Sequence, residues 1–345
     1  MKKPEERIVA PAETSIVEGA ENYSSFRYAV GAILAFFGIS TKTHRASKKR
    51  AKLVGDVFTY IILLFGSFLM VYPFWWMVAG SFSYTIGGGT TTMLENLVWW
   101  PSQSTIGRED VGMFFNYRVL FTSAFASAGL KVSYWRAVLN NLIYSIVPVV
   151  VGVITSASAA FSFAKIPWIG RNIVFFFLLA AIMVPGPSLM ITQYVMYSNM
   201  GWAGDSPLAL IIPGMFGSIM TAFFIRQFLF GLPTSIIEAA KIDGAGYFRI
   251  FVQFILPLAM PAIMAQGLLS FMGCWNNYMG SFIYVTPTSK WINLPHAMQY
   301  ITDGESASMG TIVAASVMCV LPVIILFGCF QKLIIGSLML TGSKE

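Results

Sequence analysis

The sequence predicts an all-α membrane protein with six transmembrane helices and both termini in the cytoplasm. Its 345 residues are 56% hydrophobic and only 11% charged, whereas a soluble domain has about 25% charged residues. The mean hydropathy is +0.69. Because too few polar residues are present to cover a soluble surface, these values exclude a disordered chain, a disulfide-rich secreted domain and a soluble enzyme.

Long charge-free intervals place the predicted helices, because burying a charge at the centre of a bilayer is costly. Six intervals reach the roughly 20 residues that a helix needs to cross the hydrocarbon. Pro257 and Pro261 are expected to kink the fifth helix or to separate it from a short interfacial piece. We therefore expect spans near residues 57–81, 138–163, 172–197, 207–228, 253–284 and 309–334.

The distribution of Lys and Arg sets the predicted orientation. With the N-terminus inside, 17 of the 22 basic residues fall in cytoplasmic segments and five fall outside, and such an asymmetry is typical of multi-pass membrane proteins. The basic run Lys48, Lys49, Arg50 and Lys52 is expected to bind the inner leaflet, and no nucleic-acid partner is expected. The apolar stretch 28–39 is too short to span, so it is interpreted either as an interfacial helix or as a loosely packed segment before the first span.

These boundaries divide the chain into four segments. Residues 1–52 form the basic cytoplasmic N-terminal segment, and residues 53–136 form the first transmembrane helix and a long extracytoplasmic loop. Residues 137–334 form the core, with five transmembrane helices and a cytoplasmic loop at 230–250. Residues 335–345 form a cytoplasmic tail.

The residue types that carry catalysis or metal binding are scarce. Cys274, Cys319 and Cys329 lie in apolar runs and are expected to be small core residues. The only histidines are His44 and His296, and the chain has no Gly-Lys pair, hence no G-x-x-x-x-G-K-[ST] phosphate loop. We expect no catalytic residue, metal or cofactor in this chain. An intramembrane enzyme is the alternative from another class, and an ion-coupled carrier would need ionisable groups within the spans.

The segment between the fourth and fifth predicted spans carries the most specific local signal. Pro233 is expected to stop the preceding helix, and Ser235-x-x-Glu238 predicts a capping box, in which each side chain accepts a hydrogen bond from the other residue's backbone N–H. Asp243-Gly244 is expected to end this helix, because glycine accepts a left-handed conformation. A second short helix is expected to follow. A short cytoplasmic helix and a sharp bend suit a partner-binding element; the alternative is an ordinary connecting loop.

The same segment resembles the EAA loop of binding-protein-dependent ABC importer permeases. That resemblance rests on Glu238-Ala239-Ala240-x-x-Asp243-Gly244-Ala245, followed by Leu256-Pro257-Leu258 and Pro261. The chain also resembles one group within this family, the maltose-type carbohydrate permeases, and that likeness covers about residues 110–345. The further matching segments are Phe115-Asn116-Tyr117, Asn140-Asn141, Met183-Val184-Pro185-Gly186, Trp275-Asn276-Asn277 and Gln331-Lys332.

The resemblance implies the type I ABC importer permease fold in the bacterial plasma membrane, and uptake of a sugar or oligosaccharide. It also implies three kinds of partner: a second homologous permease subunit in a heterodimer, two ATP-binding cassette subunits that bind ATP and Mg²⁺, and an extracytoplasmic sugar-binding protein. An importer permease for a non-sugar solute is the alternative. Coupling to the ATPase subunits is assigned to Ser235, Glu238, Ala239, Ala240, Asp243, Gly244 and Ala245.

Two groups of polar residues near the outer ends of the predicted spans are candidates for the substrate pathway. Trp275, Asn276 and Asn277 are interpreted either as sugar contacts or as part of an aromatic belt and helix packing. Many members of the family carry an acid where this chain has Asn277, so a charge-dependent role at that position is not carried over. Asn140 and Asn141 are interpreted either as pathway residues or as interhelical hydrogen-bonding residues.

Two further features complete the expected sites. Pro185-Gly186 breaks the third span near its middle, and non-helical backbone at that depth is tolerated only against protein or a cavity. Gln193 follows in the same span, either as a pathway residue or as a packing residue. The outer loop near residues 286–309 is expected to bind the sugar-binding protein through Trp291 and His296, because these residue types suit interfaces.

Overall fold

The computed structural model describes the backbone of residues 44–83, 114–303 and 308–342, and the side chains of 55–83, 114–303 and 308–331. The chain forms two compact units, Met1–Pro73 and Phe74–Glu345. The expected interfacial helix at 28–39 lies outside the described residues, as does most of the long outer loop.

In the first unit, the described residues belong to helix α2 (His44–Ser81). Its portion Gly55–Ser81 is long and apolar enough to cross a membrane, close to the predicted span at 57–81. Apolar side chains project on all sides of the helix between Gly55 and Pro73 and are mostly exposed, for example Leu64 at 70% and Met70 at 78%, whereas the last turn of α2 is buried, with Ala79 at 4%. A helix that is apolar all round is typical of a helix surrounded by lipid or by another subunit.

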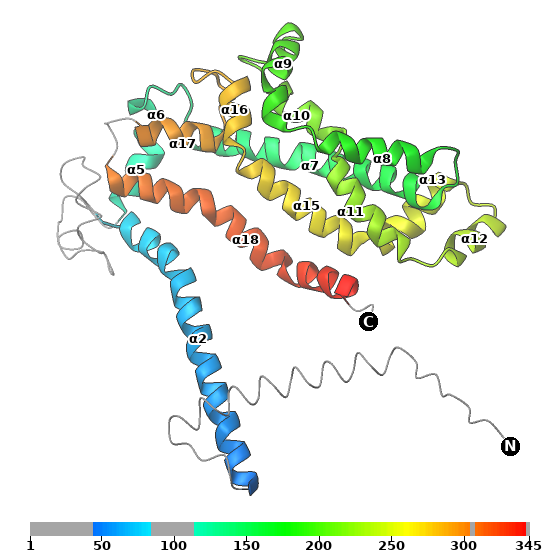
Figure 1. Cartoon of the computed structure of the whole chain (residues 1–345). Helices are drawn as coiled ribbons and strands as arrows, with labels where there is room; N and C mark the ends of the chain where they lie inside the picture. Colours follow the sequence, from blue (N-terminus) through cyan, green and yellow to red (C-terminus); the bar gives the residue numbers. More distant parts are fainter. Residues whose placement is uncertain (1–43, 84–113, 304–307, 343–345) are drawn as a thin grey trace, which may run out of the picture. The chain divides into compact units, whose positions relative to one another are not determined.

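The second unit is a bundle built around the long helix α7 (Tyr134–Lys165) (Figure 1). This helix packs against α10 (Leu208–Met215), α11 (Ile219–Phe230) and α15 (Met260–Trp275). The last helix, α18 (Met309–Gly342), packs against α15. Because these helices are apolar on most faces, close packing between them contributes more to the stability of the bundle than local helix propensity does.

Four short helices gather at one end of the bundle. They are α5 (Phe115–Thr122), α6 (Ala124–Ser127), α16 (Tyr278–Tyr284) and α17 (Leu294–Asp303) (Figure 1). Together with residues 285–293 we call them the cap. The cap has a hydrophobic core of its own, which it shares with the first turn of α7 and with the ends of α15 and α18. Its members include Leu120, Phe125, Tyr134, Trp275, Ile292, Leu294 and Ile301.

The opposite end of the bundle carries a helix–bend–helix element. It consists of α12 (Ser235–Ile242) and α13 (Tyr247–Ile250). We call residues 231–250 the α12 segment. After it come a π-helical turn, η1 (Phe251–Ile255), and the single turn α14 (Leu256–Leu258).

The third and fifth predicted spans are broken near their prolines, as the sequence predicts. The third predicted span is two helices, α8 (Arg171–Ile182) and α9 (Gly186–Asn199), which meet at 94°. The break falls at Pro185, since proline has no N–H to continue the helical ladder. The fifth span bends by 77° between Tyr247–Leu258 and Met260–Trp275.

The expectation that the fifth helix continues to residue 284 is wrong. The helix ends at Trp275, and Asn277 leaves the helical conformation with φ −76° and ψ 79°. Its Oδ1 then accepts a hydrogen bond from the backbone N–H of Gly280 at 2.9 Å, which caps the separate helix α16. Asparagine favours such local capping over a helix interior.

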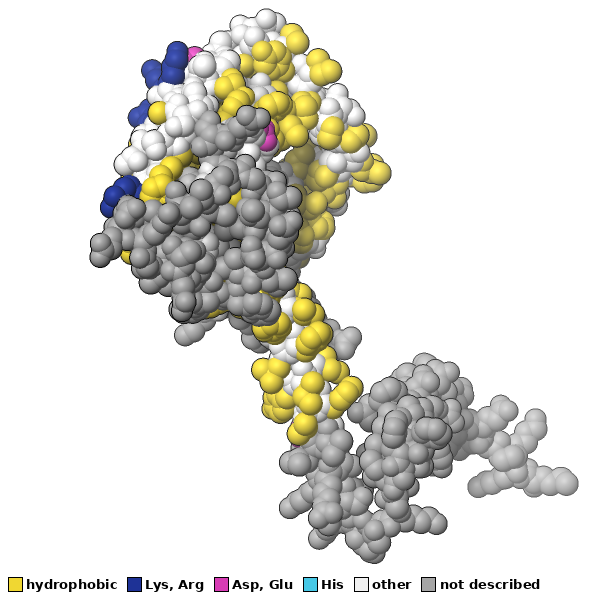
Figure 2. Space-filling model, turned by 90° about the vertical axis from the view of Figure 1, so that its left-hand side faces the viewer, with side chains coloured by type: hydrophobic (Ala, Val, Ile, Leu, Met, Phe, Trp, Pro, Cys, Tyr) yellow, Lys and Arg dark blue, Asp and Glu magenta, His cyan; other side chains and the backbone are white. Residues whose placement is uncertain are grey.

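Length and composition allow four to six membrane spans among the described residues. Four helices qualify singly, and the count reaches six if each bent pair is one span, so the number six stays a prediction. Figure 2 shows apolar side chains over part of the face of the larger unit that is in view, and the Lys and Arg side chains visible there lie along one edge. Exposed apolar surface of this extent is typical of a chain covered by lipid or by other subunits.

Candidate functional site

Helix α12 begins differently from the prediction. Its N-cap residue is Thr234, in a helical conformation with φ −72° and ψ −22°, and no side chain accepts a hydrogen bond from the free N–H groups there. Ser235 is instead the first residue of the helix. The predicted capping box is therefore wrong, because a capping side chain can reach N2 or N3 only from an extended N-cap residue. Glu238 lies in the first turn, where a carboxylate still favours the helix dipole.

The end of α12 agrees with the prediction. Asp243 is the C-cap residue, and Gly244 follows with φ +78°. The Ala245 N–H donates to the Ala240 carbonyl at 3.0 Å, and the Gly244 N–H donates to the Lys241 carbonyl at 3.0 Å. This pair of bonds is the Schellman motif, which requires a left-handed residue after the C-cap. Gly244 is thus the residue that turns the chain from α12 toward α13.

One face of α12 is attached to the bundle. Ile237 and Ala240 are 6% and 4% exposed and belong to a core cluster that includes Phe161 on α7 and Leu229 on α11. A side chain fixed in this way moves with its neighbours, because protein interiors are close-packed. The buried face of α12 therefore belongs to the same hydrophobic core as residues of α7 and α11.

The other face of α12 is open. Glu238 and Ala239 are exposed, and the apolar side chains of Ile242 and Phe248 are 87% and 81% exposed. The Lys241 Nζ donates to the Tyr247 hydroxyl at 2.8 Å, so this lysine bridges the bend between the two helices. Small and apolar residues on a rigid protrusion form a surface suited to a protein partner.

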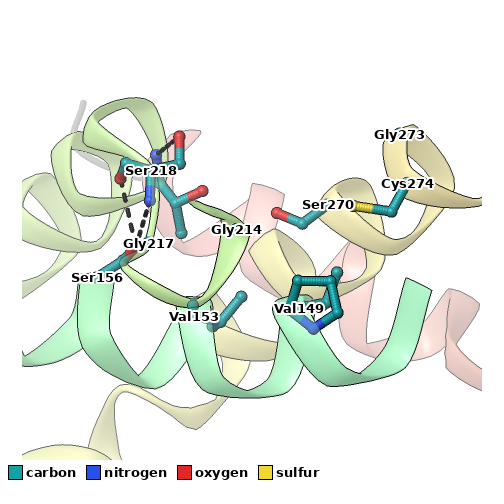
Figure 3. A pocket seen from close by; sticks show the side chains of 12 residues that line it. Val149, Val153, Ser156, Gly214, Gly217, Ser218, Ser270, Gly273 and Cys274 are labelled. Atoms are coloured by element: carbon teal, nitrogen blue, oxygen red, sulfur yellow. Dashed lines mark hydrogen bonds between the residues drawn. The ribbon is translucent and has the colours of Figure 1, made fainter. Parts of the chain in front are cut away.

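A cavity of about 250 Å³ opens between α7, α15 and the link from α10 to α11 (Figure 3). Its lining is mainly apolar, with small residues on all three elements. The Ser156 Oγ accepts a hydrogen bond from the Ser218 N–H at 2.9 Å, while Ser270 and Cys274 face these groups from α15 (Figure 3).

Glycines make this close packing of α7 against the α10–α11 link feasible. A Cβ on Gly152 would lie 2.2 Å from the Gly214 carbonyl oxygen, and Gly217 has φ +87°. None of the cavity residues was among the sequence candidates. A signal was present nonetheless, because Gly152-x-x-x-Ser156 is a pair of small residues spaced for close helix packing.

The two asparagines of α7 are fully buried between the bundle and the cap. The Asn140 Nδ2 donates to the carbonyl oxygens of Lys290 at 2.9 Å and Ile292 at 2.8 Å. The Asn141 Nδ2 donates to the Trp275 carbonyl at 3.1 Å. Neither Oδ1 atom has a hydrogen-bond partner among the described residues. Both amides thus join α7 to distant backbone, the geometry of a structural clamp.

The other pathway candidates fall into two places. Trp275 is 2% exposed, and its Nε1 donates to the Cys319 carbonyl at 3.0 Å. Asn277, besides capping α16, accepts on its carbonyl from the Asn293 Nδ2 at 3.0 Å. Asn276 is exposed, and its Nδ2 donates to the Met272 carbonyl of its own helix at 2.9 Å. The structure therefore brings Trp275 and Asn277 together with the α7 asparagines beside the cap.

The candidates of the broken third span lie apart from this group. Pro185 and Gly186 are exposed at the bend between α8 and α9. Gln193 on α9 accepts a hydrogen bond on its Oε1 from the Tyr284 hydroxyl at 3.2 Å. No residue of α9 is buried by the described chain. A pathway role for these residues consequently needs another subunit opposite α9.

The two residues expected to bind the sugar-binding protein differ in accessibility. Trp291 is partly exposed, with the Arg136 guanidinium carbon 5.2 Å and the Lys290 Nζ 5.7 Å from its ring. His296 is 1% exposed, with its Nδ1 3.2 Å from the Ser281 Oγ and rings of Tyr278, Phe282 and Tyr300 around it. Burial lowers the pKa of His296 to about 4. Only Trp291 therefore offers surface to a partner.

Comparison with known families finds a match that contains the α12 segment. Residues 149–338 match the family model described as the binding-protein-dependent transport system inner membrane component. The chain belongs to this family. The match contains the whole α12 segment, the cavity except for Pro148, and most of the cap, whereas Asn140 and Asn141 precede it.

The alignments of this permease with individual relatives cover most of the length of each relative. It is 29% identical over 283 residues to the arabinooligosaccharides transport system permease protein AraQ of Halalkalibacterium halodurans, covering 81% of this chain and 93% of the relative. It is 26% identical to the diacetylchitobiose uptake system permease protein NgcG of Streptomyces coelicolor, covering 81% and 86%.

A solved structure has the same fold. The crystal structure of a bacterial ABC transporter involved in the import of the acidic polysaccharide alginate contains a chain that matches this permease with a TM-score of 0.65. The match covers 85% of this chain and 99% of that chain, at 22% identity. The permease is therefore an inner-membrane protein with the all-helical ABC importer fold.

Proposed function

We propose that this permease is the membrane subunit of an ABC importer for a sugar or an oligosaccharide. The observation that carries this proposal is the shared chemistry of its relatives. The two relatives described above are named for arabino-oligosaccharides and for diacetylchitobiose, which are unlike each other in detail but are both short sugar chains. A permease of the same family for a non-sugar solute is the alternative.

In the proposed assembly the chain has six spans with both termini in the cytoplasm, and it pairs with a second, homologous permease. The exposed apolar surfaces of α8 and α9 support such pairing: Phe176 and Phe177 on α8 are each 66% exposed, and Ile191 on α9 is 79% exposed. The excess of Lys and Arg in the segments assigned to the cytoplasm supports the orientation.

Transport is driven by two ATPase subunits that bind ATP and Mg²⁺ and contact the open face of the α12 segment. When the ATPase subunits close, they displace this segment, and the anchored side chains of Ile237 and Ala240 carry the motion into α7 and α11. The bundle then alternates between inward-open and outward-open states, a rigid-body rearrangement without covalent chemistry in this chain. At the opposite end, the surface around Trp291 binds the sugar-binding protein.

Reconstituted uptake tests the proposed substrate class. The permease, its partner subunits and the co-encoded binding protein are placed in liposomes, with or without enclosed ATP. We expect ATP-dependent uptake of labelled oligosaccharides and none with a non-hydrolysable ATP analogue. A binding protein that binds amino acids or other non-sugar solutes, and no sugar from a panel of mono- and oligosaccharides, would refute the sugar assignment but not family membership.

Thiol labelling in intact cells tests the orientation. A single cysteine introduced at Gly246, in the α12 segment, should be protected from a membrane-impermeant reagent, and one introduced at Gly88 should react. Both cysteines should react after the membrane is permeabilised, which controls for buried thiols. Labelling of the Gly246 position in intact cells would reverse the proposed topology.

A further inference from the structure

The turn between α7 and α8 gathers three cationic side chains from three helices. Lys165 ends α7, and its Nζ donates to the Leu232 carbonyl at 2.6 Å. Arg171 begins α8, and its Nη1 donates to the Ile166 carbonyl at 3.2 Å. Arg226, near the end of α11, reaches the first turn of α8, where its Nη2 lies 3.5 Å from the Asn172 Oδ1.

Arg226 is held in place by two aromatic rings. Its guanidinium carbon lies 4.0 Å from the ring centroid of Phe175 and 4.5 Å from that of Phe230. Its Nε also donates to the Phe163 carbonyl at 3.4 Å. Cation–π contacts of this kind orient the guanidinium, and Arg171 is close enough to Arg226 to repel it electrostatically. Two like charges are therefore fixed near each other.

No acidic side chain of the described residues compensates these charges. The hydrogen-bond acceptors of all three cations are carbonyl oxygens and one amide oxygen. The first turn of α8 contains no Asp or Glu either. Like charges without a counter-ion repel each other, so the arrangement favours binding of an anion from outside the chain.

Apolar residues lie in the same turn. Ile169 is 101% exposed, so the chain gives it no cover at all. Trp168 is partly exposed, and its Nε1 donates to the Ser162 carbonyl at 3.3 Å. The turn joins two helices that qualify as membrane spans or as part of one, which places it at a membrane surface. Tryptophan and a fully exposed isoleucine beside cations suit the boundary between headgroups and acyl chains.

We propose that Lys165, Arg171 and Arg226 bind the phosphate headgroup of an anionic phospholipid, while Trp168 and Ile169 insert among its acyl chains. The preference of basic residues for the cytoplasmic side accounts for their presence in this turn, but not for an arginine fixed between two rings beside a second arginine. The exposed side chain of Ile169 favours a lipid over inorganic phosphate, because an ion does not cover an apolar side chain with hydrocarbon. The experiment below distinguishes the lipid from an acidic protein surface.

Lipid retention by the whole transporter complex tests the proposal. The complex is prepared in nanodiscs of phosphatidylcholine containing a minor fraction of phosphatidylglycerol, released, and examined by native mass spectrometry for bound lipid. Arg171→Gln is the first variant, because its single hydrogen bond to a carbonyl can be kept by glutamine. We expect retention of phosphatidylglycerol to fall roughly fivefold for each positive charge removed, and further in Lys165→Gln/Arg171→Gln. Lys131→Gln, an exposed lysine outside this turn, is the matched control and should retain wild-type levels.

A second variant separates the lipid from other anions. Ile169→Ser keeps all three charges and should also reduce phosphatidylglycerol retention. The melting temperature of the complex is also compared between discs that contain phosphatidylglycerol and discs of phosphatidylcholine alone with added inorganic phosphate. A rise with phosphate equal to the rise with phosphatidylglycerol would indicate an ion site and overturn the proposal. Unchanged lipid retention in Lys165→Gln/Arg171→Gln would overturn it too. Loss of ATPase subunits from that variant with unchanged lipid retention would identify the turn as a protein contact, which also contradicts the proposal.

Discussion

The two ends of the bundle are stabilised in opposite ways. The bend of the α12 segment is shaped by bonds between near neighbours, such as Ala245 to Ala240, and the buried residues of helix α12 itself are Ile237 and Ala240. The cap is joined to α7 by the Asn140 side chain, which reaches backbone 150 and 152 residues away in the sequence, and Asn141 joins α7 to the end of α15, 134 residues away. The first end is thus a locally specified protrusion, and the second is a layer fixed by long-range polar contacts.

This difference predicts different sensitivities to substitution. A locally folded protrusion tolerates the loss of a polar side chain, because its backbone groups remain near water or near other residues of the same turn. A buried long-range clamp does not, because each lost bond leaves a carbonyl without a partner, which costs about 1–3 kcal/mol. The four predictions below run from the largest expected effect to the smallest.

The largest effect is expected from Asn140→Ala. It removes both hydrogen bonds to the carbonyls of Lys290 and Ile292, so we expect a loss of about 2–5 kcal/mol in the stability of the cap. Limited proteolysis should then cut residues 285–303 more rapidly. Asn276→Ala is the control, because its amide bonds only within its own helix turn and should cost under about 1 kcal/mol. Equal proteolysis of both variants would contradict the clamp.

The second effect is a loss of cap stability in acid. His296 has its pKa lowered to about 4 by burial, whereas an unfolded histidine titrates near 6.5. The unfolded state therefore binds more protons between these values, and stability falls as the pH drops from about 6.5 to about 4, by at most about 3 kcal/mol.

Thermal unfolding of the complex across this pH range measures the effect of His296. The variant His296→Phe keeps an aromatic ring in the pocket of Tyr278, Phe282 and Tyr300 and removes the titration. Its melting temperature should depend less steeply on pH than that of the wild type. The same slope in both proteins would show that another group governs the acid sensitivity.

The third effect belongs to the α12 segment. Gly244→Val places a β-branched side chain at φ +78°, which costs roughly 1–2 kcal/mol locally. We expect the bundle to insert normally, but binding of the ATPase subunits or coupling of hydrolysis to uptake to weaken. Subunit stoichiometry, ATP hydrolysis and sugar uptake are measured together on one preparation. Gly246→Val is the stability control, since Gly246 has φ −72° and open space around it. If stoichiometry, hydrolysis and uptake all stay at wild-type values in the Gly244 variant, the segment only connects two helices and does not couple them to the ATPase subunits.

The smallest effect is expected from Glu238→Ala. Since α12 has no capping box, this change removes only an exposed carboxylate near the helix dipole, worth about 0.3–1 kcal/mol. Ser235→Ala should have no larger effect on stability, because the serine side chain caps nothing. A loss above about 1 kcal/mol in either variant, in thermal unfolding of the complex, would indicate that the capping box forms in solution after all.

The sequence by itself determined the features that depend on neighbouring residues. Pro185 breaks the third span and Gly244 ends α12 because a missing N–H and a left-handed backbone act within one turn. The same local reasoning went wrong at Ser235, where the capping pattern is present but Thr234 is helical. The Ser235-x-x-Glu238 pattern specifies which capping hydrogen bonds are available. The backbone conformation after Pro233 decides whether they form.

Only the tertiary structure decided what the polar residues of the bundle contact. The sequence left Asn140 and Asn141 open between a pathway and a packing role, and the structure directs their amides to backbone at Ile292 and Trp275. Likewise it buries His296, which the loop composition had suggested as an interface residue, and it forms the cavity beside Gly152 from α7, α15 and the link between α10 and α11. Such contacts join residues far apart in the chain, so they follow from how the helices pack and not from any short stretch of sequence.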